Sequence, residues 1–85
     1  MFYVYVVESE TTSSFYIGFT SRLDERIKEH NRGQSKSTKN RGPWKLIGYL
    51  MTETRSEAMR LERKLKSFKR KDRVYNYIRK HGHLL

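Results

Sequence analysis

Two short apolar runs near the start of the chain predict a pair of β-strands. Residues 2–7 are β-branched or aromatic throughout, a composition that is typical of strands. Residues 8–14 are polar and small and predict a loop, and residues 15–18 form a second apolar run that closes on Gly18. A glycine there indicates the end of the strand or a close backbone approach. Two strands joined by a short polar loop predict an antiparallel hairpin.

Apolar residues at helical spacing then predict a first helix. Ser21 with Asp24 three residues later resembles a capping box, in which two side chains satisfy free backbone amides at the start of a helix. Leu23, Ile27 and His30 share one face of this helix, which should end near residues 31–33.

A loop, a third strand and two further helices complete the pattern. Residues 33–43 are polar, basic and rich in turn formers, which predicts a mobile loop, and residues 44–51 predict a strand. Thr54 with Glu57 is a capping box that opens a second helix. The buried stripe of that helix is formed by Ala58, Leu61, Leu65 and Phe68. A third helix follows, with an apolar side made by Val74, Tyr77, Ile78 and His81.

These elements predict one α+β domain over residues 1–85, a three-stranded antiparallel sheet flanked by about three helices. A chain of 85 residues buries only about 60% of the surface that its unfolded form exposes, so its core is thin. The chain has no cysteine, which excludes disulfides and thiolate metal sites. No apolar run approaches the ~20 residues of a membrane span, and we expect neither a signal peptide nor a membrane partner.

Positive charge is concentrated in the second half of the chain. Nineteen Lys and Arg stand against nine Asp and Glu, giving a net charge of +10. Eight of the basic residues lie between Arg60 and Arg73. Such clusters neutralise phosphates, so we expect a nucleic acid as partner, in preference to the alternative of a solvated basic helix face. The residues predicted to contact it are Lys64, Lys66, Lys69, Arg70, Lys71 and Arg73.

Helix geometry places two charged residues beside the buried faces. At roughly 100° per residue, Arg26 lies at the rim of the first helix's apolar face, and Glu62 lies at the rim of the second. A charge at a rim can face a cleft, so both are candidates for chemistry. The alternative for Glu62 is an ion pair with Lys66 one turn later. His81 and His83 lie near an end that we expect to fray, and without accompanying carboxylates they predict no metal site.

The order of several short motifs resembles the GIY-YIG nuclease superfamily. Tyr3-Val4-Tyr5 and Tyr16-Ile17-Gly18 are similar to its paired motif, with Tyr3 where the family name has glycine. The similarity continues through the run from Thr20 to Asn31, the segment around Trp44, and the helix that carries Glu62. It covers nearly the whole chain, and it is strongest to the small stand-alone members.

The resemblance implies a role for each matching residue. Tyr5 and Tyr16 correspond to the motif tyrosines at the cleavage site, and His30 to a residue that supports the site. Arg26 corresponds to the catalytic arginine, which stabilises charge on the phosphate. Glu62 corresponds to the single carboxylate that binds a divalent metal, Mg²⁺ or Mn²⁺. Asn76 falls opposite the apolar face of its helix and is a poor match to the family's late asparagine.

We therefore expect a metal-dependent endonuclease that hydrolyses DNA phosphodiester bonds with low sequence specificity. The resemblance implies a role in DNA repair or processing, and we expect the protein in the bacterial cytoplasm or at the nucleoid. Phe19 stands where repair enzymes of the family carry a lysine, which favours an alternative: a weak or inactive DNA- or RNA-binding module of the same fold. A third interpretation, a small structural or ribosome-associated basic protein, depends on charge alone.

Overall fold

The computed structural model describes residues 1–32 and 42–85. Most of the predicted loop over residues 33–43 therefore lies outside the described residues. The strands are β1 (Phe2–Ser9), β2 (Phe15–Thr20), β3 (Trp44–Thr52) and β4 (His83–Leu84). The helices are α1 (Leu23–Asn31), α2 (Arg55–Ser67) and α3 (Lys71–His81). None of the helices within these two stretches is long and apolar enough to cross a membrane.

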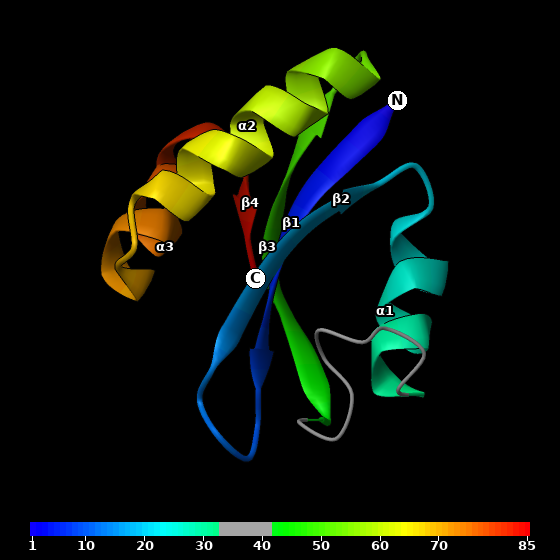
Figure 1. The fold of residues 1–85 in the computed structure, drawn as a ribbon, viewed down its shortest axis with the longest axis vertical. Helices are drawn as coiled ribbons and strands as arrows, with labels where there is room; N and C mark the ends of the chain where they lie inside the picture. Colours follow the sequence, from blue (N-terminus) through cyan, green and yellow to red (C-terminus); the bar gives the residue numbers. More distant parts are fainter. Residues whose placement is uncertain (33–41) are drawn as a thin grey trace.

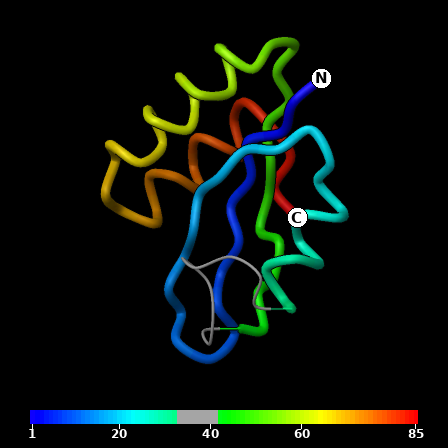
Figure 2. The backbone as a smooth tube through the Cα atoms, turned by 45° about the vertical axis from the view of Figure 1, so that its right-hand side comes forward, coloured from blue at the N-terminus to red at the C-terminus, as the bar shows by residue number. Residues whose placement is uncertain are grey.

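The strands form one antiparallel sheet in the order β2-β1-β3-β4. The hairpin of β1 and β2 is confirmed, and β1 runs between β2 and β3 (Figure 2). Tyr5 on β1 faces Gly18 on β2 and Tyr49 on β3. Because successive side chains of a strand point to opposite faces, β1 sends Val4 and Val6 to one face and Tyr5 to the other.

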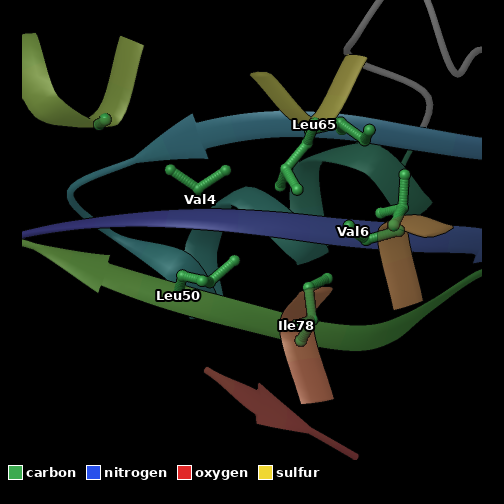
Figure 3. Packing of buried hydrophobic residues seen from close by; sticks show 8 residues of the cluster. Val4, Val6, Leu50, Leu65 and Ile78 are labelled. Atoms are coloured by element: carbon green, nitrogen blue, oxygen red, sulfur yellow. The ribbon is translucent and has the colours of Figure 1, made fainter. Parts of the chain in front are cut away.

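Helices cover both faces of the sheet (Figure 1). On one face, α2 and α3 pack over a core whose buried members include Val4, Val6, Leu50, Leu65 and Ile78 (Figure 3). On the other face, α1 packs over a second buried cluster, formed by Tyr5, Val7 and Trp44. The predicted α+β class and the three predicted helices are confirmed.

The two predicted capping boxes have different outcomes. Thr54 accepts a hydrogen bond from the Glu57 amide and the Glu57 carboxylate accepts one from the Thr54 amide, so the box at α2 is confirmed. The box at Ser21 is wrong, because α1 follows Arg22 as its N-cap and has no side-chain cap. The Arg22 amide donates instead to Thr20 Oγ1, at 3.0 Å. The tight turn out of β2 leaves Ser21 one position too early to cap the helix.

The sheet has a fourth strand that the sequence pattern did not predict. After α3, the chain turns at Gly82 and β4 pairs with β3, with His83 opposite Tyr49 and Leu84 opposite Gly48. The expectation that this end frays is therefore wrong. A two-residue strand leaves no alternating pattern in the sequence, and its pairing depends on where α3 ends.

Candidate active site

A buried tyrosine–histidine pair lies where α1 packs on the sheet. Tyr5 and His30 are each about 1% exposed, and Tyr5 Oη lies 2.7 Å from His30 Nε2. Burial raises the pKa of Tyr5 to about 12, although the Arg26 guanidinium acts in the opposite direction. Burial, and then the charge of Arg26, lowers the pKa of His30 to about 4. At neutral pH both side chains are therefore uncharged, and the Tyr5 hydroxyl and His30 Nε2 share a hydrogen bond.

Gly18 makes room for this pair. A Cβ on Gly18 would lie 2.6 Å from Tyr5 Oη and 2.9 Å from Tyr5 Cζ, closer than Cβ atoms come to other atoms in folded proteins. The ring of Tyr5 thus crosses β2 where that strand has no side chain. The strand continues to Thr20, so Gly18 does not mark its end, and the close approach there is by a side chain instead of the predicted backbone.

Tyr16 lies beside the pair, with its ring centre 6.4 Å from that of Tyr5 and 5.1 Å from that of His30. Unlike Tyr5 and His30, it is only partly buried. Its hydroxyl has no hydrogen-bond partner within the described part of the chain. Since β2 is an edge strand of the sheet, Tyr16 can present this hydroxyl to a ligand.

Arg26 reaches the same place from α1. Its guanidinium donates to Glu29 at 2.9 Å, and its side chain is 30% exposed. Burial works to lower the pKa of Arg26, but hydrogen bonds to Glu29 and Tyr5 leave that pKa raised. The hydrogen bond from Arg26 in turn lowers the pKa of Glu29. Arg26 is a fixed positive charge that borders both Tyr5 and solvent.

Glu62 approaches from the opposite face of the sheet. Seven residues earlier on the same side of α2, the Arg55 guanidinium lies 5.5 Å from the ring centre of Phe19 on β2. This flank of α2 therefore lies along the edge strand, and the charge of Glu62 adds a small contribution to the rise in the pKa of Tyr5 that burial causes. The Glu62 side chain is 23% exposed, and its Oε1 lies 3.5 Å from Lys66 Nζ. The ion pair with Lys66, the alternative to a functional role for Glu62, is therefore also present.

The five predicted catalytic residues therefore gather around the β2 edge, where α1 and α2 approach it from opposite faces. Glu62 is the carboxylate available to a cation there, and no cluster of three or more metal-ligating side chains occurs among the residues that the structure describes. A single carboxylate fits Mg²⁺ or Mn²⁺, because Mg²⁺ keeps several waters and takes further oxygens from substrate phosphates. The donor set thus fits a cation held jointly by protein and substrate.

The basic residues predicted to contact nucleic acid fall into two groups: those that already interact with other residues of the protein, and those that are exposed without an ion pair in the described part of the chain. Lys66 pairs with Glu62, Arg70 with Asp72, and Lys64 lies 5.0 Å from the ring centre of Tyr77. Lys71 donates to Glu8 and to the Ser13 carbonyl, each at 2.7 Å. The other two, Lys69 and Arg73, are exposed and have no ion pair within residues 1–32 and 42–85.

Sequence reasoning missed two sets of contacts that hold the site in place. Asn31 Oδ1 accepts from the Trp44 amide at 2.6 Å, and its Nδ2 donates to the Trp44 carbonyl, which ties the end of α1 to β3. Glu8 accepts from Lys71 and Tyr75, which ties α3 to β1, and these bonds outweigh burial and lower the pKa of Glu8. The partners lie 13 to 67 positions apart, so no local pattern reveals them.

Comparison with known proteins identifies relatives of this chain. Residues 1–78 match the family model described as the GIY-YIG catalytic domain. A UPF0213 protein of Haloquadratum walsbyi is 39% identical over 69 residues, which cover 80% of this chain and 76% of that protein. A UPF0213 protein of Staphylococcus haemolyticus is 40% identical over 73 residues, covering 85% and 88% of the two chains.

A solved structure is also similar. The solution NMR structure of a UPF0213 protein from Bacillus halodurans has a TM-score of 0.48 and 39% identity, covering 79% of this chain and 72% of that one. The family model spans the paired tyrosines, Arg26, His30 and Glu62. The chain therefore belongs to the GIY-YIG family of nuclease domains, and its relatives are UPF0213 proteins.

Proposed function

We propose that this protein is a metal-dependent endonuclease that hydrolyses DNA phosphodiester bonds with low sequence specificity, in DNA repair or processing. One observation carries the proposal: Tyr16, Arg26 and Glu62 are partly exposed around one sheet edge, in front of the buried Tyr5–His30 pair. A hydroxyl that directs water, a fixed positive charge for the phosphate and a carboxylate that can hold a metal ion are groups that assist phosphodiester hydrolysis. Membership of the GIY-YIG family supports the same reaction class.

Arg26 binds the scissile phosphate in this proposal. Its guanidinium keeps its charge at any physiological pH, and its planar fork of donors matches two phosphate oxygens. Glu29 holds that fork in place at 2.9 Å and leaves other donor positions free for a ligand. Charge that grows on the phosphoryl oxygens in the transition state is thereby stabilised.

Tyr16 orients the attacking water, and the pair behind it positions Tyr16. The hydroxyl of Tyr16 can both donate and accept a hydrogen bond, so in this proposal it directs the water toward the phosphate. Tyr5 and His30 are too deeply buried to touch the substrate. They pack edge-on or tilted against the Tyr16 ring and fix its direction, which makes them positioning residues.

Glu62 would hold the divalent cation, Mg²⁺ or Mn²⁺, together with oxygens of the substrate. When bound, such a cation withdraws electron density from the phosphate and stabilises the leaving oxygen. To hold a cation, Glu62 would give up its contact with Lys66. Lys66 is then free to contact the DNA backbone beside the cleavage site.

A supercoiled-plasmid nicking assay tests the proposal. Cleavage should require Mg²⁺ or Mn²⁺, stop with EDTA, and fall by at least about 10²-fold in Glu62→Gln, the scale of losing a charged group at the reacting centre. Glu53→Gln removes an exposed carboxylate on the turn before α2 and serves as the matched control with unchanged cleavage. Equal cleavage by wild type and Glu62→Gln contradicts the assignment.

The alternative is a DNA- or RNA-binding module that retains the nuclease fold without turnover. The Glu62–Lys66 ion pair favours it, because this pair engages the carboxylate that would otherwise hold the cation. Affinity that is independent of metal and unchanged in Arg26→Ala, with no nicking above a mock preparation, favours the module over the enzyme.

A further inference from the structure

A second aromatic site lies on the sheet face that α1 only partly covers. A surface hollow of about 480 Å³ opens there, beside the start of α1 and away from Tyr16 and Glu62. Its sheet side is made by Tyr3, Leu46 and Tyr49, and its helix side includes Arg22, Leu23 and Asp24. None of these residues has a role in the proposed chemistry.

Three aromatic rings run across neighbouring strands, two of them lining the hollow and the third stacked beside them. Tyr3 on β1 meets Tyr49 on β3 edge-on, with ring centres 5.9 Å apart. His83 on β4 stacks on Tyr49 with ring centres 5.0 Å apart and planes 30° from parallel. Tyr3 and Tyr49 are half-buried, His83 is exposed, and Met51 beside Tyr3 is 49% exposed. The fourth strand, which the sequence did not predict, is what brings the third ring to this row.

The polar groups of the hollow suit a nucleobase better than a phosphate. Neither tyrosine hydroxyl has a hydrogen-bond partner in the described stretches, so each can bond the edge of a base. Arg22 is already paired with Glu25 at 3.0 Å, and Asp24 adds a further negative charge. These carboxylates repel a phosphate but accept hydrogen bonds from the exocyclic amino groups of cytosine or adenine.

We propose that this row of rings, Tyr3, Tyr49 and His83, binds an unpaired base of single-stranded DNA. Aromatic side chains on an exposed sheet are a sequence-tolerant platform for unstacked bases, whereas bases inside a duplex have both faces occupied. The inference rests on the proposed function and extends it: the substrate contains an unpaired segment, as at a flap, fork or frayed end.

Stacking can be measured without cleavage. In EDTA, an oligonucleotide that carries the fluorescent base 2-aminopurine is titrated with protein, because stacking on an aromatic ring quenches that base. Wild type should quench single-stranded DNA and bind it more tightly than a duplex of equal length. Tyr49→Leu should remove the quenching and weaken single-stranded binding by about 5- to 100-fold, the effect of one stacked base. Tyr49→Phe keeps the ring and should keep the quenching, with at most the smaller loss of affinity that removal of one hydroxyl causes.

Matched controls separate stacking from misfolding. His83→Ala removes an exposed ring and should reduce quenching, whereas His81→Ala removes a histidine that packs on Tyr77 instead and should not. Duplex affinity should stay the same in all four variants. Equal losses for duplex and single strand, or unchanged quenching in both Tyr49→Leu and His83→Ala, would overturn the inference while leaving the nuclease proposal intact. Tighter binding of the matching RNA would overturn the assignment to DNA, and no binding of any nucleic acid would overturn both proposals.

Discussion

At the level of single residues, the protein keeps Tyr5 and His30 uncharged by burying them against each other. This arrangement lowers the stability of the folded protein at acidic pH. The pKa of His30 is about 4 in the folded protein and 6.5 in an exposed histidine. Between these pH values the imidazole is therefore protonated in the unfolded chain and neutral in the folded protein. The stability that depends on neutral His30 is complete above pH 6.5 and is lost as the pH falls toward 4.

We therefore predict that His30 makes folding acid-sensitive. Between pH 7 and pH 4 the wild type should lose up to about 3 kcal/mol more stability than His30→Gln, which cannot titrate. Urea unfolding followed by circular dichroism at several pH values measures the difference. The carboxylates are the same in both proteins and cancel in the comparison. Parallel curves for the two proteins would mean that His30 is not held neutral by the fold.

A second prediction distinguishes Arg26 from Lys69, two cations with different surroundings. Arg26 borders the buried tyrosine, whereas Lys69 is exposed in the turn after α2. Arg26→Ala should lower saturated turnover by at least about 10²-fold, as loss of a transition-state contact does, with folding retained. Lys69→Ala should raise the half-saturation concentration a few-fold and leave turnover nearly intact. Single-turnover cleavage against protein concentration separates the two effects, and identical behaviour would remove Arg26 from the active site.

At the level of elements, the two helix starts make a matched experiment. Thr54→Ala removes the side chain that caps α2 and should cost about 1 kcal/mol of stability. Ser21→Ala changes a similar residue before α1, but Ser21 caps nothing and should change stability by only a few tenths of a kcal/mol. Thermal or urea unfolding gives both values. A comparable loss in Ser21→Ala would show that α1 is capped in solution by the motif that the sequence suggested.

The elements themselves were predictable because each has a strong local cause. Aromatic and β-branched runs gave three strands, and apolar spacing gave three helices. The errors occurred where the outcome depends on geometry beyond the segment. Ser21 and Thr54 begin similar motifs, and only the tightness of the turn after β2 decides between them. The short β4 exists because α3 ends beside the free edge of β3.

The candidate site was predictable to a similar degree. The motif resemblance selected five residues that the fold brings to one sheet edge, including a carboxylate from the opposite face. The sequence did not reveal that Tyr5 and His30 are buried while Tyr16 is accessible, because all three occupy similar apolar patterns. It also could not show that Lys71 pairs with Glu8, since the two are separated by 63 positions.

At the level of the whole molecule, half of the basic side chains between Arg60 and Arg73 are available to a polyanion. Of its eight cations, Lys64, Lys66, Arg70 and Lys71 are engaged, whereas Arg60, Arg63, Lys69 and Arg73 are exposed without ion pairs in the described part of the chain. With about four phosphate contacts, the log–log slope of duplex affinity against salt should be roughly −3 to −5. Fluorescence anisotropy at several salt concentrations measures it. A slope near zero would mean that this segment does not hold the DNA backbone.

The central place of β1 governs the order in which the chain can fold. Its pairing with β2 is local, but its pairing with β3 joins Phe2 to Thr52 and Ser9 to Trp44. The chain between them must therefore lose loop-closure entropy before the hydrogen bonds of the β1–β3 pair can offset that loss. Until then, the hairpin of residues 2–20 is only marginally stable and leaves one edge of an apolar strand unpaired. Fragments that end before β3 should therefore associate with one another through that edge. In the full chain, the time needed to close the loop between β1 and β3 should set how long the same edge can pair with another molecule.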